Sequence, residues 1–298
     1  MMNRREFLAA TALAAQTPSR PPNILFCITD DQSWAPPGPN VARWIRTPGF
    51  GRLAREGVLF NNAFVATPSC GPSRASILTG QDFYRLGSAS MNHTEWQARL
   101  ETYPDLLKAR GYRTGCTGKG WGPGNWRVNG RTEPPAGPQF DSATLTPPAS
   151  GLSANDYAAN FERFLKTKGE APFCFWAGFA EPHRVFEAGS GKRAGHDPSL
   201  SVVPAFLPDT AVVRDDLSDY AAEIEWADRQ LIKLLELLTK SGELENTIIV
   251  FTSDNGMAFP RAKGNLYFRR WRANCCSHNG PQYRLVTKWK CSPCSQLL

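Results

Sequence analysis

The sequence predicts an α/β fold in which a mostly parallel sheet is sandwiched by helices. Three apolar runs, 23–29, 173–179 and 247–252, are typical of central strands that are buried on both faces. A long segment between the last two runs, 218–241, carries apolar residues at helical spacing. Strands that alternate with helices along a chain favour a parallel sheet covered on both sides.

The remaining elements follow from local sequence signals. The segment 103–111 is predicted to be a helix that ends on Gly111, because glycine commonly closes helices. Glycine and proline dominate 118–151, which predicts mostly loop. In chain order, the other predicted elements are a helix over 47–57, a strand over 58–66, a helix over 73–79, a strand over 112–117 and an amphipathic helix over 155–168.

Length and charge limit the class of protein. The 298 residues can hold one large α/β domain, and no apolar run is long enough to predict a membrane span. The net charge of +7 is concentrated at the ends: the last 31 residues carry six Lys or Arg and no acidic residue. Because 25–267 is near neutral, the charge gives no reason to expect nucleic acid as a partner.

The first 20 residues are typical of an export signal. Arg4 and Arg5 precede a short apolar stretch, and the pair resembles a twin-arginine motif. The small residues of 12–14 are typical of a cleavage site. We therefore expect a signal peptide over 1–20 and a periplasmic or extracellular protein. The alternative is a disordered start with chance arginines.

Cys70 lies in the most distinctive segment of the chain. It opens the run 70–74, Cys-Gly-Pro-Ser-Arg, and Leu-Thr-Gly follows at 78–80. A cysteine held between prolines at the start of a helix is typical of a residue prepared for chemistry. The alternative is an ordinary cysteine in a proline-rich turn. By contrast, Cys27, Cys116 and Cys174 lie in apolar or strand-like runs and are expected to be buried thiols.

Acidic and amide side chains follow two of the predicted buried strands. Asp30 and Asp31 follow the first strand, and Asp254 and Asn255 follow the last. Sites in open parallel sheets form at the carboxyl ends of the strands. Three carboxylates and an amide oxygen suit Ca²⁺, or Mg²⁺, better than zinc. The alternative is that each residue only caps a strand or a turn.

Two potentially cationic side chains also follow predicted strands. Lys119 lies among glycines at a strand end, where it could hold an anion, although it could also be an ordinary surface lysine. His183 follows the strand 173–179, and its alternative role is structural. His93 and His196 have no such context, and we expect them to be loop residues.

The string Cys-x-Pro-Ser-Arg-x-x-x-Leu-Thr-Gly resembles the signature of the type I sulfatases, which belong to the alkaline-phosphatase superfamily. The segment 111–121 resembles the second sulfatase signature. Three runs, 118–124, 181–184 and 253–257, look most like the sulfamidase-like branch, which acts on heparan N-sulfate. The resemblance covers 22–267 and implies an alkaline-phosphatase-like catalytic domain over 21–267.

The resemblance also implies residue roles. In the family, the signature cysteine is oxidised by a maturation enzyme to formylglycine, whose hydrated aldehyde is the nucleophile. Transferred to this chain, Arg74 holds that hydrate, and Lys119, His183 and Lys263 bind the sulfate. Lys119 and His183 would also take part in catalysis. The implied Ca²⁺ ligands are Asp30, Asp31, Cys70 as formylglycine, Asp254 and Asn255.

The sequence departs from the family pattern at two places. The family usually has histidine two residues after the signature lysine, and here that position is Trp121. The family also continues after 267 into another strand and a smaller C-terminal domain. In this chain, 268–298 is rich in cysteine and basic residues, and we expect no such strand and no such domain.

Two interpretations of the tail compete. Cys275, Cys276, His278, Cys291 and Cys294 could bind zinc, although only the last two cysteines have a familiar spacing. Alternatively, a frameshift or truncation replaced the native continuation with unselected sequence. On the second interpretation we expect an uncovered sheet edge, poor solubility and weak activity.

Three functions therefore compete. The first is a Ca²⁺-dependent sulfatase that acts on sulfate esters or sulfamates, with a sulfated small molecule or glycan as substrate. The second is a phosphatase or phosphonate hydrolase of the same superfamily. The third is an inactive remnant that at most binds sulfated glycans.

Overall fold

A six-stranded sheet forms the centre of the molecule. The computed structural model describes residues 20–33, 44–60, 63–265 and 276–278. The strand order is β2-β8-β7-β1-β6-β4. Four neighbouring strands, β7, β1, β6 and β4, run parallel to one another. The bounds of the strands are β1 Asn23–Thr29, β2 Val58–Leu59, β4 Arg113–Gly118, β6 Phe173–Gly178, β7 Thr247–Ser253 and β8 Cys276–His278.

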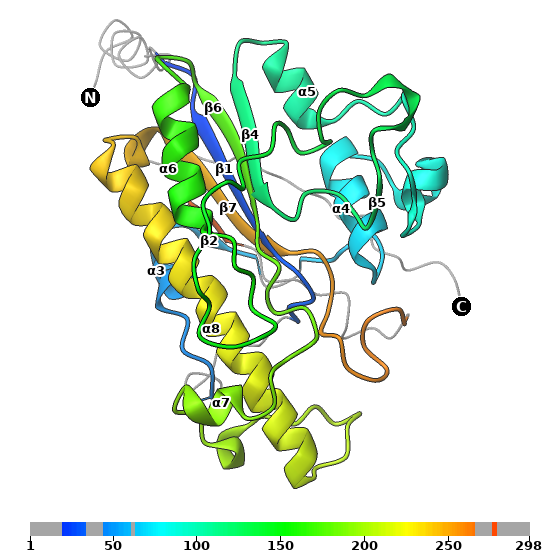
Figure 1. Cartoon of the computed structure of the whole chain (residues 1–298), viewed down its shortest axis with the longest axis vertical. Helices are drawn as coiled ribbons and strands as arrows, with labels where there is room; N and C mark the ends of the chain where they lie inside the picture. Colours follow the sequence, from blue (N-terminus) through cyan, green and yellow to red (C-terminus); the bar gives the residue numbers. More distant parts are fainter. Residues whose placement is uncertain (1–19, 34–43, 61–62, 266–275, 279–298) are drawn as a thin grey trace, which may run out of the picture.

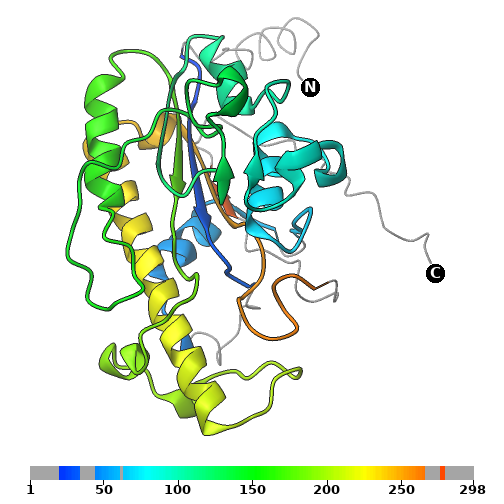
Figure 2. The same ribbon diagram turned by 45° about the vertical axis from the view of Figure 1, so that its right-hand side comes forward.

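Helices cover both faces of this sheet, as predicted (Figure 1). Helices α3, α6 and α8 pack on one face, and α4 and α5 lie on the other (Figure 2). The bounds of the helices are α3 Pro48–Glu56, α4 Cys70–Thr79, α5 Tyr103–Lys108, α6 Tyr157–Thr167, α7 Ser190–Arg193 and α8 Ala211–Lys240. The predicted α/β class is confirmed.

Several short elements lie outside the main sheet and the longer helices. Strands β3, Thr94–Glu95, and β5, Gly124–Asn125, form a separate parallel pair. The 3₁₀ helices are η1 Phe83–Arg85, η2 Gly87–Ser90, η3 Val128–Gly130, η4 Pro198–Leu200 and η5 Leu244–Asn246.

Alternate residues of β1 enter two different cores. Leu25 and Cys27 join the cluster beneath α6 and α8, whereas Ile28 joins the cluster beneath α4. Because both faces of β1 are buried, the strand appears in the sequence as a continuous apolar run. Phe161 and Phe164 of α6 are fully buried against the sheet. The central strands are therefore fixed from both sides, and their carboxyl ends are held in place.

Helix α4 starts earlier than predicted. The sequence favoured a start at Ser73, but the helix begins at Cys70, with Ser69 as its N-cap. Proline is well tolerated in the first turn, where its missing N–H has no helical partner in any case. Cys70 is thus the first residue of the helix rather than part of a preceding turn.

Helix α8 also starts earlier, at Ala211 instead of 218. The apolar spacing begins only near Leu217, so it could not indicate the first two turns. Polar contacts define them: Thr210 Oγ1 accepts a hydrogen bond from the Val213 N–H, and Arg214 binds Asp209. A capping threonine is the signal that the apolar pattern could not supply.

The predictions for two peripheral strands were wrong. Strand β2 covers only Val58–Leu59 of the predicted 58–66. The tail, which was expected to supply no strand, contributes β8, and the backbone of β8 pairs antiparallel with both β2 and β7. The expected open edge at β7 is therefore occupied by the chain's own 276–278. Backbone pairing does not require an apolar run, so the polar composition of this segment gave no signal.

Other predictions for the chain ends lie outside the described residues. These are the export signal over 1–20, of which only residue 20 is described, and a zinc site that would need Cys275, Cys291 and Cys294. Among the described residues, no helix is both long enough and apolar enough to cross a membrane.

A buried carboxyl group on α8 makes the stability depend on pH. Burial, together with nearby Glu181 and Asp219, raises the pKa of Glu223 to about 8. Its Oε2 atom has no hydrogen-bond partner among the described residues. The pKa of Glu223 in the folded protein lies above its ordinary value of 4.5. The stability that Glu223 contributes through proton binding is therefore fully present below pH 4.5. That contribution is lost as the pH rises towards 8.

We expect Glu223→Gln to raise the free energy of unfolding at pH 8 by a few kcal/mol, because the amide needs no proton to remain neutral. At pH 4.5 the variant and the parent should be nearly equal. Urea unfolding at both pH values measures the difference. Glu236→Gln, at an exposed position of the same helix, is the control. A Glu223→Gln effect that does not depend on pH would contradict the assignment.

Candidate functional site

The predicted site residues converge at the carboxyl ends of the parallel strands. Asp30 and Asp31 follow β1, and Asp254 and Asn255 follow β7. Lys119 follows β4, and His183 lies beyond the end of β6. Since these four strands are parallel, their ends lie at the same edge of the sheet (Figure 1). Helix α4 brings Cys70 and Arg74 to that edge.

Arg74 links α4 to three strand ends. Its side chain is fully buried, and Nε donates to Asp254 Oδ2 at 2.6 Å. Its Nη1 donates to the Lys119 carbonyl at 2.6 Å, and its Nη2 donates to the Thr29 carbonyl at 3.4 Å. A buried guanidinium is stable only when its charge and its donors are matched in this way. Arg74 therefore positions the ends of β1, β4 and β7 relative to α4.

Asp254 is held by several donors in addition to Arg74. Its Oδ1 accepts hydrogen bonds from the Asp31 N–H at 3.0 Å and from Asn255 Nδ2 at 2.7 Å. Its carbonyl accepts a hydrogen bond from Ser73 Oγ. Burial and the neighbouring Asp30 raise the pKa of Asp254, and the Arg74 charge opposes this shift.

The two aspartates after β1 are aligned by their backbone. The Asp30 N–H donates to the Glu181 carbonyl at 3.0 Å, which ties the end of β1 to the segment that carries His183. Asp31 has a φ of +65°, a left-handed conformation that is uncommon for residues other than glycine. Such strained positions occur where surrounding contacts impose them, and they cluster at functional sites.

Cationic side chains contact both aspartates. Lys119 Nζ forms an ion pair with Asp30 Oδ2, and Lys263 Nζ lies 2.7 Å from Asp31 Oδ1. His183 Nε2 lies 3.7 Å from Asp31 Oδ2, and its Nδ1 contacts the Arg184 carbonyl. Burial lowers the pKa of Lys263, but the charge and the hydrogen bond of Asp31, together with nearby acidic groups, outweigh it, so the pKa of this lysine is raised overall. The predicted anion-binding groups thus lie beside the predicted metal ligands.

The oxygen atoms at this edge suit a divalent cation. Asp30 Oδ1 and Asn255 Oδ1 are buried and have no hydrogen-bond partner among the described residues. Buried oxygens of this kind are costly unless they bind a donor or a cation. Ligand atoms of Asp30, Asp31 and His183 lie within 4.8 Å of one another. Carboxylate and amide oxygens match the preference of Ca²⁺ and Mg²⁺.

Cys70 differs in position from the other described cysteines. It is 3% exposed and begins α4, whereas Cys27, Cys116 and Cys174 lie within strands. Burial raises the pKa of the Cys174 thiol to about 12 and raises the pKa of the other two strand thiols as well. The strand thiols are therefore inert core residues, as predicted.

The loop after β7 returns to the Cys70 segment. The Gly264 N–H donates to the Pro68 carbonyl at 2.8 Å, which places Lys263 next to the start of α4. The Lys263 charge lies close enough to Cys70 for the two groups to interact electrostatically. Lys263 is thus brought into the site although it is distant in sequence from the other cationic residues.

Gly118 allows β4 to approach β6 closely. It has a φ of +69°, and a Cβ atom at this position would lie 2.2 Å from the Gly178 carbonyl oxygen. A larger residue would therefore displace the end of β4 and the Lys119 that follows it.

Two histidines and Trp121 have other surroundings. His93 is exposed, as expected for a loop residue. His196 also lies in a loop, as expected, but its side chain is buried, and its Nε2 lies 3.4 Å from Glu225 Oε1. Trp121 is 7% exposed and packs edge-on against Trp96 at 5.2 Å between ring centroids. The residue that replaces the expected histidine is therefore part of a core.

Sequence reasoning missed two residues that support the site. Glu181 is buried, and its carboxylate accepts hydrogen bonds from the Ser153 N–H and the Tyr157 hydroxyl. Asn92 contacts the start of α4. The only sequence signal for Glu181 was its position two residues before His183, and Asn92 had no signal because it lies in an irregular segment.

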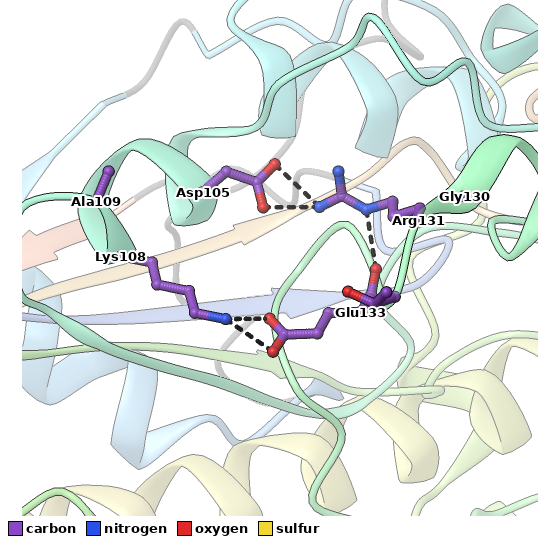
Figure 3. Close-up of a pocket in the computed structure, with 7 residues that line it drawn as sticks. Asp105, Lys108, Ala109, Gly130, Arg131 and Glu133 are labelled. Carbon is purple, nitrogen blue, oxygen red and sulfur yellow. Dashed lines mark hydrogen bonds and ion pairs between the residues drawn. The ribbon is translucent and has the colours of Figure 1, made fainter.

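A separate surface hollow lies between α5 and 130–133 (Figure 3). Its charged side chains pair with one another: Lys108 with Glu133 at 2.7 Å, and Arg131 with Asp105 at 2.8 Å. Asp105 also forms the capping box of α5. The hollow contains none of the predicted site residues, and its charges serve to attach the loop to the helix.

Comparison with known proteins adds independent findings. A protein-family model described as Sulfatase matches residues 22–282. The chain is 31% identical over 279 residues to human N-sulphoglucosamine sulphohydrolase, an alignment that covers 84% of this chain and 53% of that protein. The chain spans about half the length of the curated relatives it matches.

Solved structures share the fold. One is described as a complex with its substrate D-glucosamine-2-N,6-O-disulfate, with a TM-score of 0.62, 21% identity, and coverage of 88% of this chain and 72% of that chain. Another is a phosphonate monoester hydrolase of Agrobacterium radiobacter, with a TM-score of 0.59, 17% identity, and coverage of 87% and 68%. At these identities the likeness shows the fold alone.

We expect Arg74→Met to lower the free energy of unfolding by about 3–5 kcal/mol, because it leaves Asp254 as a buried carboxylate without its counter-charge. Urea unfolding measures the loss. Arg52→Met is the control, since Arg52 pairs with Glu56 in an exposed i,i+4 pair worth about 0.3–0.5 kcal/mol. Adding Asp254→Asn to Arg74→Met should recover part of the stability. Equal losses in the two single variants would contradict this account of Arg74.

Proposed function

The chain belongs to the sulfatase family, and on that premise we propose that it hydrolyses sulfate esters or sulfamates of sulfated carbohydrates. The nucleophile derives from Cys70, and a divalent cation, Ca²⁺ in preference to Mg²⁺, binds beside it. The relatives' names support this substrate class, because they include an N-sulphoglucosamine sulphohydrolase and an N-acetylglucosamine-6-O-sulfatase.

One observation carries the proposal. The residue that opens α4, Cys70, lies at the same sheet edge as an oxygen-rich cluster and three potentially cationic side chains. Arg74 lies one turn after Cys70 in α4, and the hydrogen bond from the Gly264 N–H to the Pro68 carbonyl brings Lys263 next to the start of the same helix. An ordinary buried cysteine would have neither a cation-binding cluster nor anion-binding groups around it.

Each group has a defined task in this proposal. Lys119, Lys263 and His183 attract the sulfate and stabilise negative charge on its oxygens. Arg74 is a positioning residue that keeps Asp254 ionised and aligned for metal binding. The cation, held by Asp30, Asp31, Asp254 and Asn255, would polarise a sulfate oxygen as a Lewis acid.

The modified form of Cys70 explains why the family uses cysteine at this position. Oxidation to formylglycine supplies a hydrated aldehyde, which can both attack sulfur and release sulfate. We propose that a separate maturation enzyme makes this change, supplying the oxidant and removing the thiol sulfur. We also propose that the chain is exported, a proposal supported by the twin-arginine-like pair Arg4-Arg5.

Charge balance favours a bound cation. The three aspartates of the site are opposed by Arg74, Lys119 and Lys263. A sulfate monoester adds negative charge, so a divalent cation would give the site the positive excess that binding this anion needs. The same cation would also bind the buried Oδ1 atoms of Asp30 and Asn255.

We predict that the full chain with oxidised Cys70 turns over glucosamine N-sulfate or sugar O-sulfates with a kcat/KM at least about a hundredfold above that for matched phosphate and phosphonate esters. Cys70→Ala should abolish the turnover. A preference for phosphorus esters would instead support the phosphonate hydrolase alternative. Binding of sulfated glycans without turnover would support the non-catalytic remnant.

We predict that Ca²⁺ raises the thermal midpoint of the chain, with a stabilisation of about 2.7 kcal/mol at a hundred times its Kd. Calorimetry with increasing Ca²⁺ measures the effect. Asp30→Asn should weaken it, because one charged ligand is lost. Asp82→Asn, outside the site, should leave it unchanged. A midpoint that responds equally in both variants would contradict the metal assignment.

A further inference from the structure

Asn92 contacts three consecutive residues at the start of α4. Its Oδ1 accepts a hydrogen bond from the Gly71 N–H at 3.0 Å and lies 3.8 Å from Cys70 Sγ, which can donate its proton. Its Nδ2 donates to Ser69 Oγ at 3.0 Å. One amide group therefore holds both the backbone and the side chain around Cys70.

These contacts supply a helix cap that the chain lacks locally. The N-cap residue, Ser69, makes no side-chain hydrogen bond to the first turn of α4. The first N–H groups of a helix have no intrahelical partner, and an oxygen from elsewhere can satisfy them. Asn92 does so from 21 residues away in sequence.

The close approach of Asn92 requires glycine at position 71. A Cβ atom on Gly71 would lie 2.3 Å from Asn92 Oδ1, which is shorter than any normal contact. Asn92 and Gly71 are thus structurally coupled. A larger residue at position 71 would force the Asn92 side chain away from Cys70.

Asn92 is itself held by its neighbours. The Met91 N–H donates to the Ser88 carbonyl at 3.1 Å, and the His93 N–H donates to the Pro123 carbonyl at 2.7 Å. Thr94 opens β3, which pairs with β5. The amide therefore projects from a segment that is fixed on both sides, and it can act as a rigid support.

We propose that Asn92 is a positioning residue that fixes the side chain at position 70 in the orientation needed for reaction. This inference rests on the proposed function. In this role, the Asn92 side-chain oxygen accepts a hydrogen bond from the side chain at position 70 and thereby restricts its rotation. Precise orientation of a reacting group can be worth about a hundredfold in rate. Asn92 itself forms no covalent bond and transfers no electron in this role.

Thiol alkylation tests the positioning without any sulfatase activity. In the full chain isolated with Cys70 as the thiol, iodoacetamide labelling is followed at each cysteine by peptide mass spectrometry. We expect Asn92→Ala to raise the labelling rate at Cys70 by about threefold or more, because the thiol gains freedom and access. The rates at Cys27, Cys116 and Cys174 should stay unchanged. A parallel rise at all four would show general destabilisation and overturn the proposal.

Kinetics of the oxidised enzyme test the consequence for turnover. We expect Asn92→Ala to lower kcat by about tenfold to a hundredfold with KM within about twofold. Gly71→Ala should have a similar effect, and the double variant should be no worse than either single variant, because both act through one contact. Asn246→Ala, at the opposite end of β7, is the matched control.

The outcomes distinguish a failure of the proposed function from a failure of the positioning role of Asn92. If the oxidised parent chain lacks sulfatase activity but the Cys70 labelling responds to Asn92→Ala, the proposed function fails and the positioning role stands. If the parent is active and neither labelling nor kcat responds, the positioning role is wrong. Additive losses in the double variant would also contradict the coupling of Asn92 to Gly71.

Discussion

The buried ion pair between Arg74 and Asp254 is the interaction on which the rest of the site depends. Arg74 donates to Asp254 at 2.6 Å and to main-chain carbonyls at the ends of β1 and β4. No other described side chain joins α4 to three strand ends in this way. Because both partners are fully buried, neither can lose the other without a large cost in stability. The helix that carries Cys70 is thereby fixed against the residues that would bind a cation.

Around this pair, charge and geometry favour the same chemistry. Asp30 and Asp31 each contact a lysine, and buried oxygens of Asp30 and Asn255 have no other described partner. Such an arrangement is poorly suited to a purely structural role, because unpaired buried oxygens are costly. It is well suited to binding a divalent cation and an anion together. The strained backbone at Asp31, whose φ is +65°, is consistent with a functional site, because such sites often retain unfavourable backbone conformations.

The sequence was sufficient for the central fold because three of the four parallel strands, β1, β6 and β7, each have their own apolar run. Because sites form at the carboxyl ends of parallel strands, the sequence also predicts that Asp30, Asp31, Asp254 and Lys119 lie close together. Contacts between distant segments could not be predicted in this way. Asn92 and Glu181 act through hydrogen bonds that depend on how loops return to the sheet. Strand β8 was missed because backbone pairing leaves no apolar pattern in the sequence.

The central claim is that Cys70 is the precursor of a nucleophile at a site built for a cation and a sulfate. The most direct test is the mass of the Cys70 peptide from the chain purified from its native host, with turnover measured on the same sample. We predict that residue 70 of the active protein is in the aldehyde form. An unmodified thiol in a sample that hydrolyses sulfate esters at full rate would contradict it.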